Sequence, residues 1–144
     1  MLKKIILAIT LILFLSLMGC QKITPITLET SDLDSYIEID SDQLVLMLNN
    51  EFDFMLYISS VTCTSCAEFS PILESVIKNY NVKVYKIEAG EYFKSNNPYL
   101  PYEFTPTVVI IDNGEVFVQI DAVKDIKTFE SYDHFIKFYQ KYIQ

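Results

Sequence analysis

Two cysteines separated by two residues, Cys63 and Cys66, constrain this chain more than any other feature. The apolar run at 52–58 has the character of a buried strand, and after the cysteines an apolar stripe recurs at helical spacing as far as Tyr80. The pair therefore lies where a strand ends and a helix begins. The first N–H groups of a helix lack internal partners and the helix dipole favours negative charge there, so this position favours a thiolate at Cys63. Cys66, one turn further into the helix, is expected to be more buried.

Three kinds of chemistry use two cysteines at this spacing. A structural zinc site needs about four ligands, and the chain adds only Cys20 and His134 to the pair. A purely structural disulfide would close a loop too small to restrict the unfolded chain much. Thiol–disulfide exchange needs an exposed attacking sulfur with a resolving sulfur beside it, and a strand–CxxC–helix context suits it. The sequence therefore favours redox chemistry at Cys63 and Cys66, with no metal and no cofactor.

The order of the expected elements predicts one α/β domain over residues 36–144. Strand-like runs alternate with helical stripes, and Asn113-Gly114 between two apolar runs indicates a hairpin. Such an order predicts a mixed five-stranded sheet with helices on both faces. Strands are expected at 36–39, 52–58, 82–87, 107–111 and 115–120, and helices at 40–48, from Cys63 to Tyr80 and from Asp125 onward, with 91–102 irregular or a short helix.

Three local details follow from the same pattern. Asp40 with Gln43 three residues later predicts a capping box at the start of a helix. Asp125 is expected to cap the last helix, whose apolar stripe runs from Ile126 to Ile143, with Phe135 beside it on a wide buried face. Strand alternation places Val116, Val118 and Ile120 on one face.

Residues 1–19 have the character of a signal peptide. Lys3 and Lys4 precede a 14-residue apolar run at 5–18, which is short for a membrane span of about 20 residues. The run ends in Leu17-Met18-Gly19-Cys20, which resembles the lipobox of bacterial lipoproteins. The resemblance implies that Cys20 is acylated and anchors the protein to the extracytoplasmic face of the cell membrane. An uncleaved N-terminal anchor is the alternative, and residues 20–35 are expected to form the lipidated cysteine and a polar tether.

The charge balance argues against nucleic acid as a partner. All eleven basic residues are lysines, against nineteen acidic residues, for a net charge of −8. Without Lys3 and Lys4 of the leader, nine lysines remain against the same nineteen acids, which is −10. No stretch forms the basic patch that nucleic-acid binding requires.

Four features in one order resemble the thioredoxin-fold family over residues 36–144. They are Cys63-Thr64-Ser65-Cys66 at a strand–helix junction, Pro71 inside the following helix, Thr105-Pro106-Thr107 opening a strand, and Asn113-Gly114-Glu115 in the last hairpin. The resemblance implies a thiol–disulfide oxidoreductase in which Cys63 attacks and Cys66 resolves. It also implies that the bond before Pro106 is cis and that Thr105 and Pro106 border the substrate beside the cysteines.

Four positions depart from typical thioredoxins. Thr62 replaces a tryptophan, Thr64-Ser65 replaces Gly-Pro, and Ala122 replaces a glycine of the substrate loop. Tyr57 stands where thioredoxins bury an acid thought to help deprotonate the resolving cysteine. These departures favour a substrate-restricted extracytoplasmic protein over a general reductase. In its lipobox and acidity the chain also resembles thioredoxin-like accessory lipoproteins of low-GC Gram-positive bacteria, including those linked to bacteriocin export.

The sequence therefore predicts a membrane-tethered oxidoreductase that acts on exported proteins with thiols or disulfides and is served by a membrane redox partner. The alternative is a thioredoxin-fold lipoprotein that binds a peptide or an export partner while its disulfide stays static. The direction of the chemistry depends on the reduction potential and the partner. Phe104, just before Thr105, either lines the substrate groove or packs in the core.

Overall fold

The computed structural model describes residues 23–95 and 102–144. The expected signal peptide and Cys20 lie outside the described residues, as does the 96–101 stretch. The strands are β1 (Ile37–Ile39), β2 (Phe54–Ser59), β3 (Val84–Glu88), β4 (Thr107–Asp112) and β5 (Glu115–Asp121). The helices are α2 (Ser41–Asn49), α3 (Thr64–Tyr80), α4 (Ala89–Lys94), α5 (Ile126–Phe129) and α6 (Tyr132–Tyr142).

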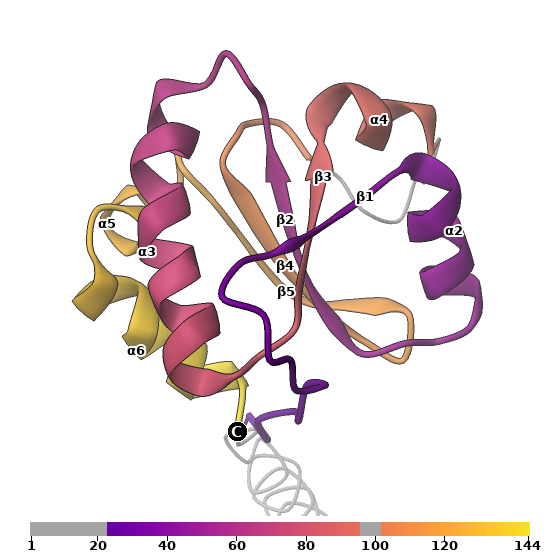
Figure 1. Cartoon of the computed structure of the whole chain (residues 1–144), viewed down its shortest axis with the longest axis horizontal. Coiled ribbons are helices and arrows are strands. Elements are labelled where there is room, and N and C mark those ends of the chain that lie inside the picture. Colours follow the sequence, from indigo (N-terminus) through magenta and orange to yellow (C-terminus); the bar gives the residue numbers. More distant parts are fainter. Residues whose placement is uncertain (1–22, 96–101) are drawn as a thin grey trace, which may run out of the picture.

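The five strands form one mixed sheet in the order β1-β3-β2-β4-β5. β2 lies at its centre, parallel to β3 and antiparallel to β4, and all six of its residues are buried. Helices α3, α5 and α6 cover one face and α2 and α4 cover the other (Figure 1). Because both faces are covered, the central strands have continuous apolar runs rather than alternating ones. The predicted α/β fold with a five-stranded sheet between helices is confirmed.

A cluster of aromatic rings holds α3 against the sheet and the C-terminal helices. The ring of Phe69, fully buried, lies edge-on to Tyr57, Phe129 and Phe135 with centroids 5.5, 4.8 and 4.9 Å away. Edge-to-face pairs at these distances add stability beyond the area they bury. The cluster therefore fixes the position of α3, the helix that begins at the cysteine pair.

Two of the predicted local motifs form as expected. The Asp40 carboxylate accepts from the Gln43 N–H at 2.9 Å while the Gln43 side chain accepts from the Asp40 N–H at 3.0 Å, which completes the capping box. Asn113 and Gly114 have φ of +51° and +75°, the left-handed pair that a tight two-residue hairpin requires. A Cβ on Gly114 would lie 2.5 Å from the Leu48 carbonyl oxygen, so this turn also needs a glycine for close packing.

The face assignment in β5 is wrong at Val116. The register between β4 and β5 shifts so that Ile110 pairs with Val118 but Ile111 pairs with Val116. The extra residue, Phe117, and Val118 both pack against the core, whereas Val116 is exposed. A β-bulge breaks the two-residue alternation of a strand, and the sequence pattern alone contains no sign of it.

The single C-terminal helix capped by Asp125 is also wrong. The chain forms two helices, and the second, α6, begins at Tyr132 and is capped by Ser131, whose hydroxyl accepts from the His134 N–H at 3.4 Å. The Asp125 carboxylate instead accepts from the Asp121 N–H at 3.3 Å. A serine cap offers the N–H groups of a new helix a partner, so the chain turns there and Phe135 is directed into the core with no exposed surface.

Part of the segment expected to be a tether lies against the domain. Leu28 is buried in the core, and short bridges join Ile26 to Ile143 and Thr30 to Val82. Ile26 and Leu28 alternate with Thr27 and Glu29, a pattern that suits a strand-like segment with one face buried. Residues 26–31 are therefore part of the folded unit.

Candidate redox site

Cys63 and Cys66 form a disulfide where the central strand gives way to α3. Cys63 is the N-cap of α3, and its Cα lies 5.2 Å from that of Cys66. The Cys66 N–H points at the Cys63 sulfur at a distance of 3.0 Å. Cys66 is 3% exposed while Cys63 is half-buried. The two sulfurs are thus unequal: one can meet another molecule and the other is enclosed.

The turn between β2 and α3 presents Cys63 outward. β2 ends at Ser59, and the Cys63 N–H donates to the Ser60 carbonyl at 3.1 Å, which closes the turn. The hydroxyls of Ser60 and Thr62 lie 3.2 Å apart within it. Val61 at its tip is 90% exposed. An apolar side chain so exposed beside a reactive sulfur offers a contact to a bound protein.

The segment around Pro106 lies directly beside Cys63. The peptide bond between Thr105 and Pro106 is cis, and the Thr105 carbonyl oxygen is 3.4 Å from the Cys63 sulfur. The segment is held by the start of β4, where the Thr107 hydroxyl donates to the Phe104 carbonyl at 2.6 Å. Phe104 itself is 43% exposed, so of the two expected placements the core is excluded. The structure thus brings Thr105 and Pro106 to the disulfide, as the resemblance implies.

Asp121, the last residue of β5, orders the loop that follows it and that faces Pro106. Its carboxylate accepts from the N–H groups of Val123 and Lys124 at 2.9 and 2.8 Å, and the Ala122 N–H donates to the Pro106 carbonyl at 3.0 Å. Burial alone would raise the pKa of Asp121, but these N–H groups and the Lys124 ammonium hold that pKa below its ordinary value. The buried carboxylate therefore stabilises the folded state in its ionised form.

We expect Asp121→Asn to lower the free energy of unfolding by about 1 kcal/mol at neutral pH, because charge-assisted hydrogen bonds become neutral ones. Since the pKa of Asp121 is lowered on folding, its contribution is present above the unfolded value of 3.8 and is lost as the pH falls through the folded value. Urea unfolding of both proteins across the acid range measures this. A difference that grows toward acid pH would contradict the assignment.

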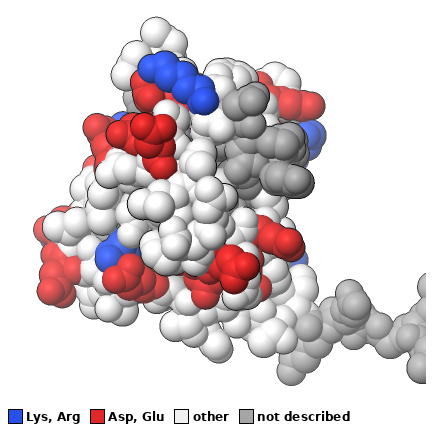
Figure 2. All heavy atoms as spheres, turned by 90° about the vertical axis from the view of Figure 1, so that its right-hand side faces the viewer, with Lys and Arg blue, Asp and Glu red and all other residues white. Residues whose placement is uncertain are grey.

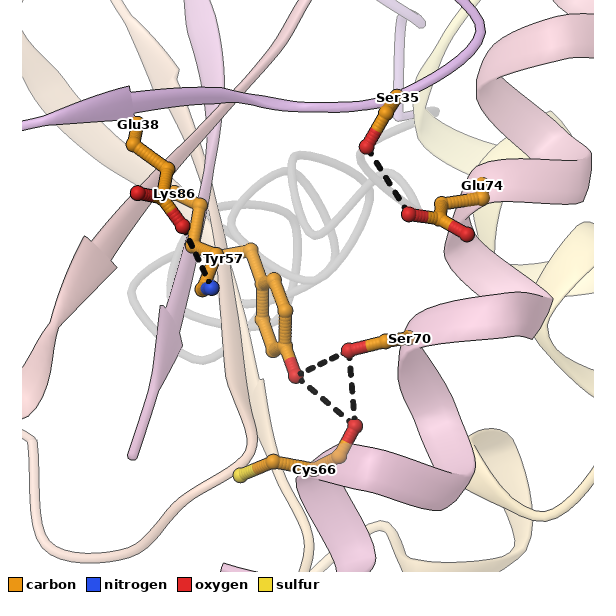
Figure 3. Close-up of polar contacts among 7 residues, drawn as sticks. All are labelled: Ser35, Glu38, Tyr57, Cys66, Ser70, Glu74 and Lys86. Carbon is orange, nitrogen blue, oxygen red and sulfur yellow. Dashed lines mark hydrogen bonds and ion pairs between the residues drawn. The ribbon is translucent and has the colours of Figure 1, made fainter. Parts of the chain in front are cut away.

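Behind the disulfide, a tyrosine hydroxyl occupies the position where typical thioredoxins bury an acid. Tyr57 is fully buried, and its hydroxyl donates to the Cys66 carbonyl and lies beside the Ser70 hydroxyl, both at 3.3 Å (Figure 3). Ser70 also donates to the Cys66 carbonyl, at 2.9 Å. Burial raises the pKa of Tyr57, so its hydroxyl stays neutral. At this position the chain therefore has a neutral hydroxyl that donates a hydrogen bond, in place of a carboxylate that could accept a proton.

A charged pair borders the same side of the site. The Lys86 ammonium lies 2.9 Å from a Glu38 carboxylate oxygen and 4.8 Å from the centre of the Tyr36 ring. Lys86 also lines a small cleft of about 150 Å³ together with Tyr57, Cys66 and Ser70. Burial lowers the pKa of Lys86, but Glu38 and Tyr36 together outweigh this and the pKa is raised. The ammonium therefore stays charged at the edge of the cleft.

Sequence reasoning missed Lys86, Glu38 and Ser70. Glu38 and Tyr57 are both paired with Lys86 across parallel strands, so the three residues lie at one level of the sheet (Figure 3). This level depends on strand register, and a central strand such as β2, buried on both faces, has no alternating pattern that would set it. For Ser70, four residues after Cys66 on one helix, the spacing itself was an available signal.

We expect Tyr57→Phe to lower the free energy of unfolding of the oxidised protein by about 1 kcal/mol, the usual worth of one buried hydrogen bond. The Cys66 carbonyl keeps its bond from Ser70, so the loss is small. Because the hydroxyl is neutral, the pH dependence of thiol exchange should not change. Urea unfolding and exchange rates across the neutral range measure both, with Ser70→Ala as the matched control. A shifted pH profile in Tyr57→Phe alone would show that Tyr57 takes part in proton transfer.

Within residues 23–95 and 102–144, no three His, Cys, Asp or Glu side chains come together that could hold a metal ion. In the same part of the chain, no helix has the length and apolar character needed to cross a membrane.

No protein-family model matches this chain, and no curated protein matches its sequence. Solved structures do match. A variant thioredoxin from Halobacterium salinarum is 16% identical with a TM-score of 0.60, over 81% of this chain and 97% of that one. Thioredoxin f from spinach chloroplast is 17% identical with a TM-score of 0.57, over 74% and 85%. Oxidised thioredoxin O2 from Arabidopsis thaliana is 16% identical with a TM-score of 0.56, over 75% and 94%. The chain therefore has the thioredoxin fold.

Proposed function

We propose that this thioredoxin-fold protein is a thiol–disulfide oxidoreductase whose reacting atoms are the sulfurs of Cys63 and Cys66. The observation that carries the proposal is the inequality of the two sulfurs. Cys63 is accessible at a helix N-terminus and faces a backbone N–H, whereas Cys66 is enclosed. A thiolate at Cys63 gains from the helix dipole and from that N–H. A disulfide with no exchange function has no need of this arrangement.

In the oxidising direction, a substrate thiolate attacks the Cys63 sulfur. A bond forms between the substrate and Cys63 while the bond between Cys63 and Cys66 breaks, and Cys66 leaves as a thiolate that takes up a proton. A second substrate thiolate then attacks the substrate sulfur of the mixed disulfide. The substrate leaves with its own disulfide, and Cys63 leaves as the thiolate that the helix stabilises. The reducing direction is the reverse, with Cys66 attacking the mixed disulfide to release the substrate.

The surface around Cys63 suits an extended peptide. The Thr105 carbonyl is 3.4 Å from the sulfur, close enough to accept a backbone N–H from a peptide whose cysteine reacts. Val61, Phe104 and Val123 are exposed on the three loops that border this point. Apolar side chains with backbone groups between them favour binding of unfolded or flexible protein segments over small polar molecules.

The anchoring of the protein is proposed from the sequence. The Leu17-Met18-Gly19-Cys20 stretch after a short apolar run supports acylation at Cys20 and a place on the extracytoplasmic face of the cell membrane. The partners there would be exported proteins with thiols or disulfides and a membrane redox partner that restores the working state. Incorporation of a labelled fatty acid, present in the native chain and lost in Cys20→Ser, tests this part.

Exchange with a defined substrate tests the proposed activity. The reduced full chain, in detergent, should reduce an accessible protein disulfide, and the oxidised chain should oxidise a reduced peptide with two cysteines. The double variant Cys63→Ser/Cys66→Ser, which keeps the shape of both residues, should do neither. If native and double-variant chains are equally inactive in both directions, the activity is refuted and the protein is a binding module with a static disulfide.

A further inference from the structure

Residues 26–31, here called the strap, bind the domain through several backbone hydrogen bonds. The Ile26 N–H donates to the Tyr142 carbonyl at 2.9 Å, and the Gln144 N–H donates to the Ile26 carbonyl at 3.0 Å. Further along, the Ser31 N–H donates to the Asn81 carbonyl at 2.7 Å. The strap therefore joins the C-terminal end of α6 to the C-terminal end of α3.

Side chains reinforce the strap. Leu28 is 6% exposed and belongs to the core cluster beneath α3 and α6. The Glu29 carboxylate lies 2.7 Å from the Lys83 ammonium, and the Lys83 N–H donates to the Glu29 carbonyl at 2.8 Å. A buried leucine and this set of bonds make the strap part of the fold.

The strap and the disulfide lie at opposite ends of α3. Cys63 caps the N-terminus of this helix, and Asn81, which accepts from the strap, caps its C-terminus. The 17 residues of α3 make it about 25 Å long, at about 1.5 Å per residue. Figure 1 shows the beginning of α3 at one end of the molecule and the C-terminus, beside the start of the described chain, at the other.

The chain between the proposed lipid and the strap is too short for the domain to turn over so that the disulfide end of α3 faces the membrane. Only six residue steps separate Cys20 from Ile26, so this leash spans at most about 20 Å at about 3.3 Å per residue. Inversion would lift the strap above the bilayer by at least the length of α3, about 25 Å. A free tether as far as Tyr36 would span about 50 Å and would allow it.

We infer that the strap holds the Cys63–Cys66 disulfide away from the membrane. The partners of the site, the membrane redox partner included, are then proteins that present their thiols or disulfides in the aqueous space, above the bilayer surface. The inference rests on the proposed anchor at Cys20. Acidic side chains outnumber basic ones on the face in Figure 2, so anionic lipid repels the domain as a whole within about a Debye length, without selecting which end faces the bilayer.

Energy transfer from the site to the bilayer measures this orientation. The acylated Cys66→Ser chain, labelled with a donor dye at Cys63, is reconstituted in vesicles of phosphatidylcholine and phosphatidylglycerol with an acceptor on a headgroup. Its partner variant carries a 15-residue Gly-Ser insertion between Lys22 and Ile23, which extends the leash to about 70 Å and leaves the strap intact. We expect transfer to rise at least about twofold in the insertion variant. Equal transfer in the two proteins would overturn the inference.

A second pair of variants tests the strap itself. Leu28→Asp places a charge in the core beneath the strap, whereas Leu33→Asp makes the same change two residues after the strap, at a side chain that is 51% exposed. Transfer should rise with Leu28→Asp and stay at the native value with Leu33→Asp. If Leu28→Asp unfolds the domain, the comparison of the native and insertion chains still tests whether the strap orients the site.

Failure of the anchor is distinguishable from failure of the strap. If the native chain does not float with vesicles and carries no acyl group, the proposed anchor is refuted, and the inference with it. If the chain floats and its transfer already equals that of the insertion variant, the anchor stands and the strap does not orient the site.

Discussion

Cells that express the Cys66→Ser chain should accumulate exported proteins bound covalently to Cys63. In the proposed mechanism, the second sulfur releases a mixed disulfide by attacking it. Without that sulfur, the accessible Cys63 can still form a mixed disulfide but cannot release the bound protein. In Cys63→Ser the remaining sulfur is that of Cys66, which is 3% exposed in the native structure, so few adducts should form. We expect at least a tenfold difference in adduct yield, roughly the effect of enclosing a thiol.

Non-reducing gels of acid-quenched membrane fractions measure the adducts, and a reductant should remove them. The double variant Cys63→Ser/Cys66→Ser gives the background. Similar yields from the two single variants would mean that the sulfurs are equivalent, against the burial in the structure. If neither variant forms adducts while both are present in the membrane, the binding-module alternative is favoured.

Phe69→Ala should have the largest effect on stability. The ring has no exposed surface and contacts Tyr57, Phe129 and Phe135. Removing a buried phenylalanine costs about 3–5 kcal/mol, since transfer energy is lost and a cavity remains. Domains of this size have a free energy of unfolding of about 5–15 kcal/mol. We therefore expect the variant to lose much of its stability.

Chemical unfolding of the oxidised protein measures the loss. Phe93→Ala is the matched control, because the side chain of Phe93 is 67% exposed and its removal should cost less than about 1 kcal/mol. A small loss in Phe69→Ala would show that the aromatic cluster does not hold α3 in place.

The local motifs of this protein were readable from the sequence because each depends on residues close together in the chain. The Asp40–Gln43 capping box spans one turn, and the Asn113-Gly114 turn needs two adjacent residues with left-handed backbone angles. The cysteine pair is of the same kind, since a strand ending in Ser59 and a helix beginning at Thr64 place Cys63 at a helix N-terminus. The order of such elements was sufficient for the fold class.

Three features depended on contacts between distant residues, and only the tertiary structure decided them. Glu38, Tyr57 and Lys86 meet at one level of the sheet because of strand register. The bulge that exposes Val116 is a property of the β4–β5 pair and of neither strand alone. The strap was expected to be a tether because its polar residues dominate its composition. It instead lies on the domain because Leu28 fits the core and its backbone finds partners at least fifty residues away, at Asn81 and Tyr142. A composition pattern records how polar a segment is, whereas its free energy of docking depends on the surface it meets.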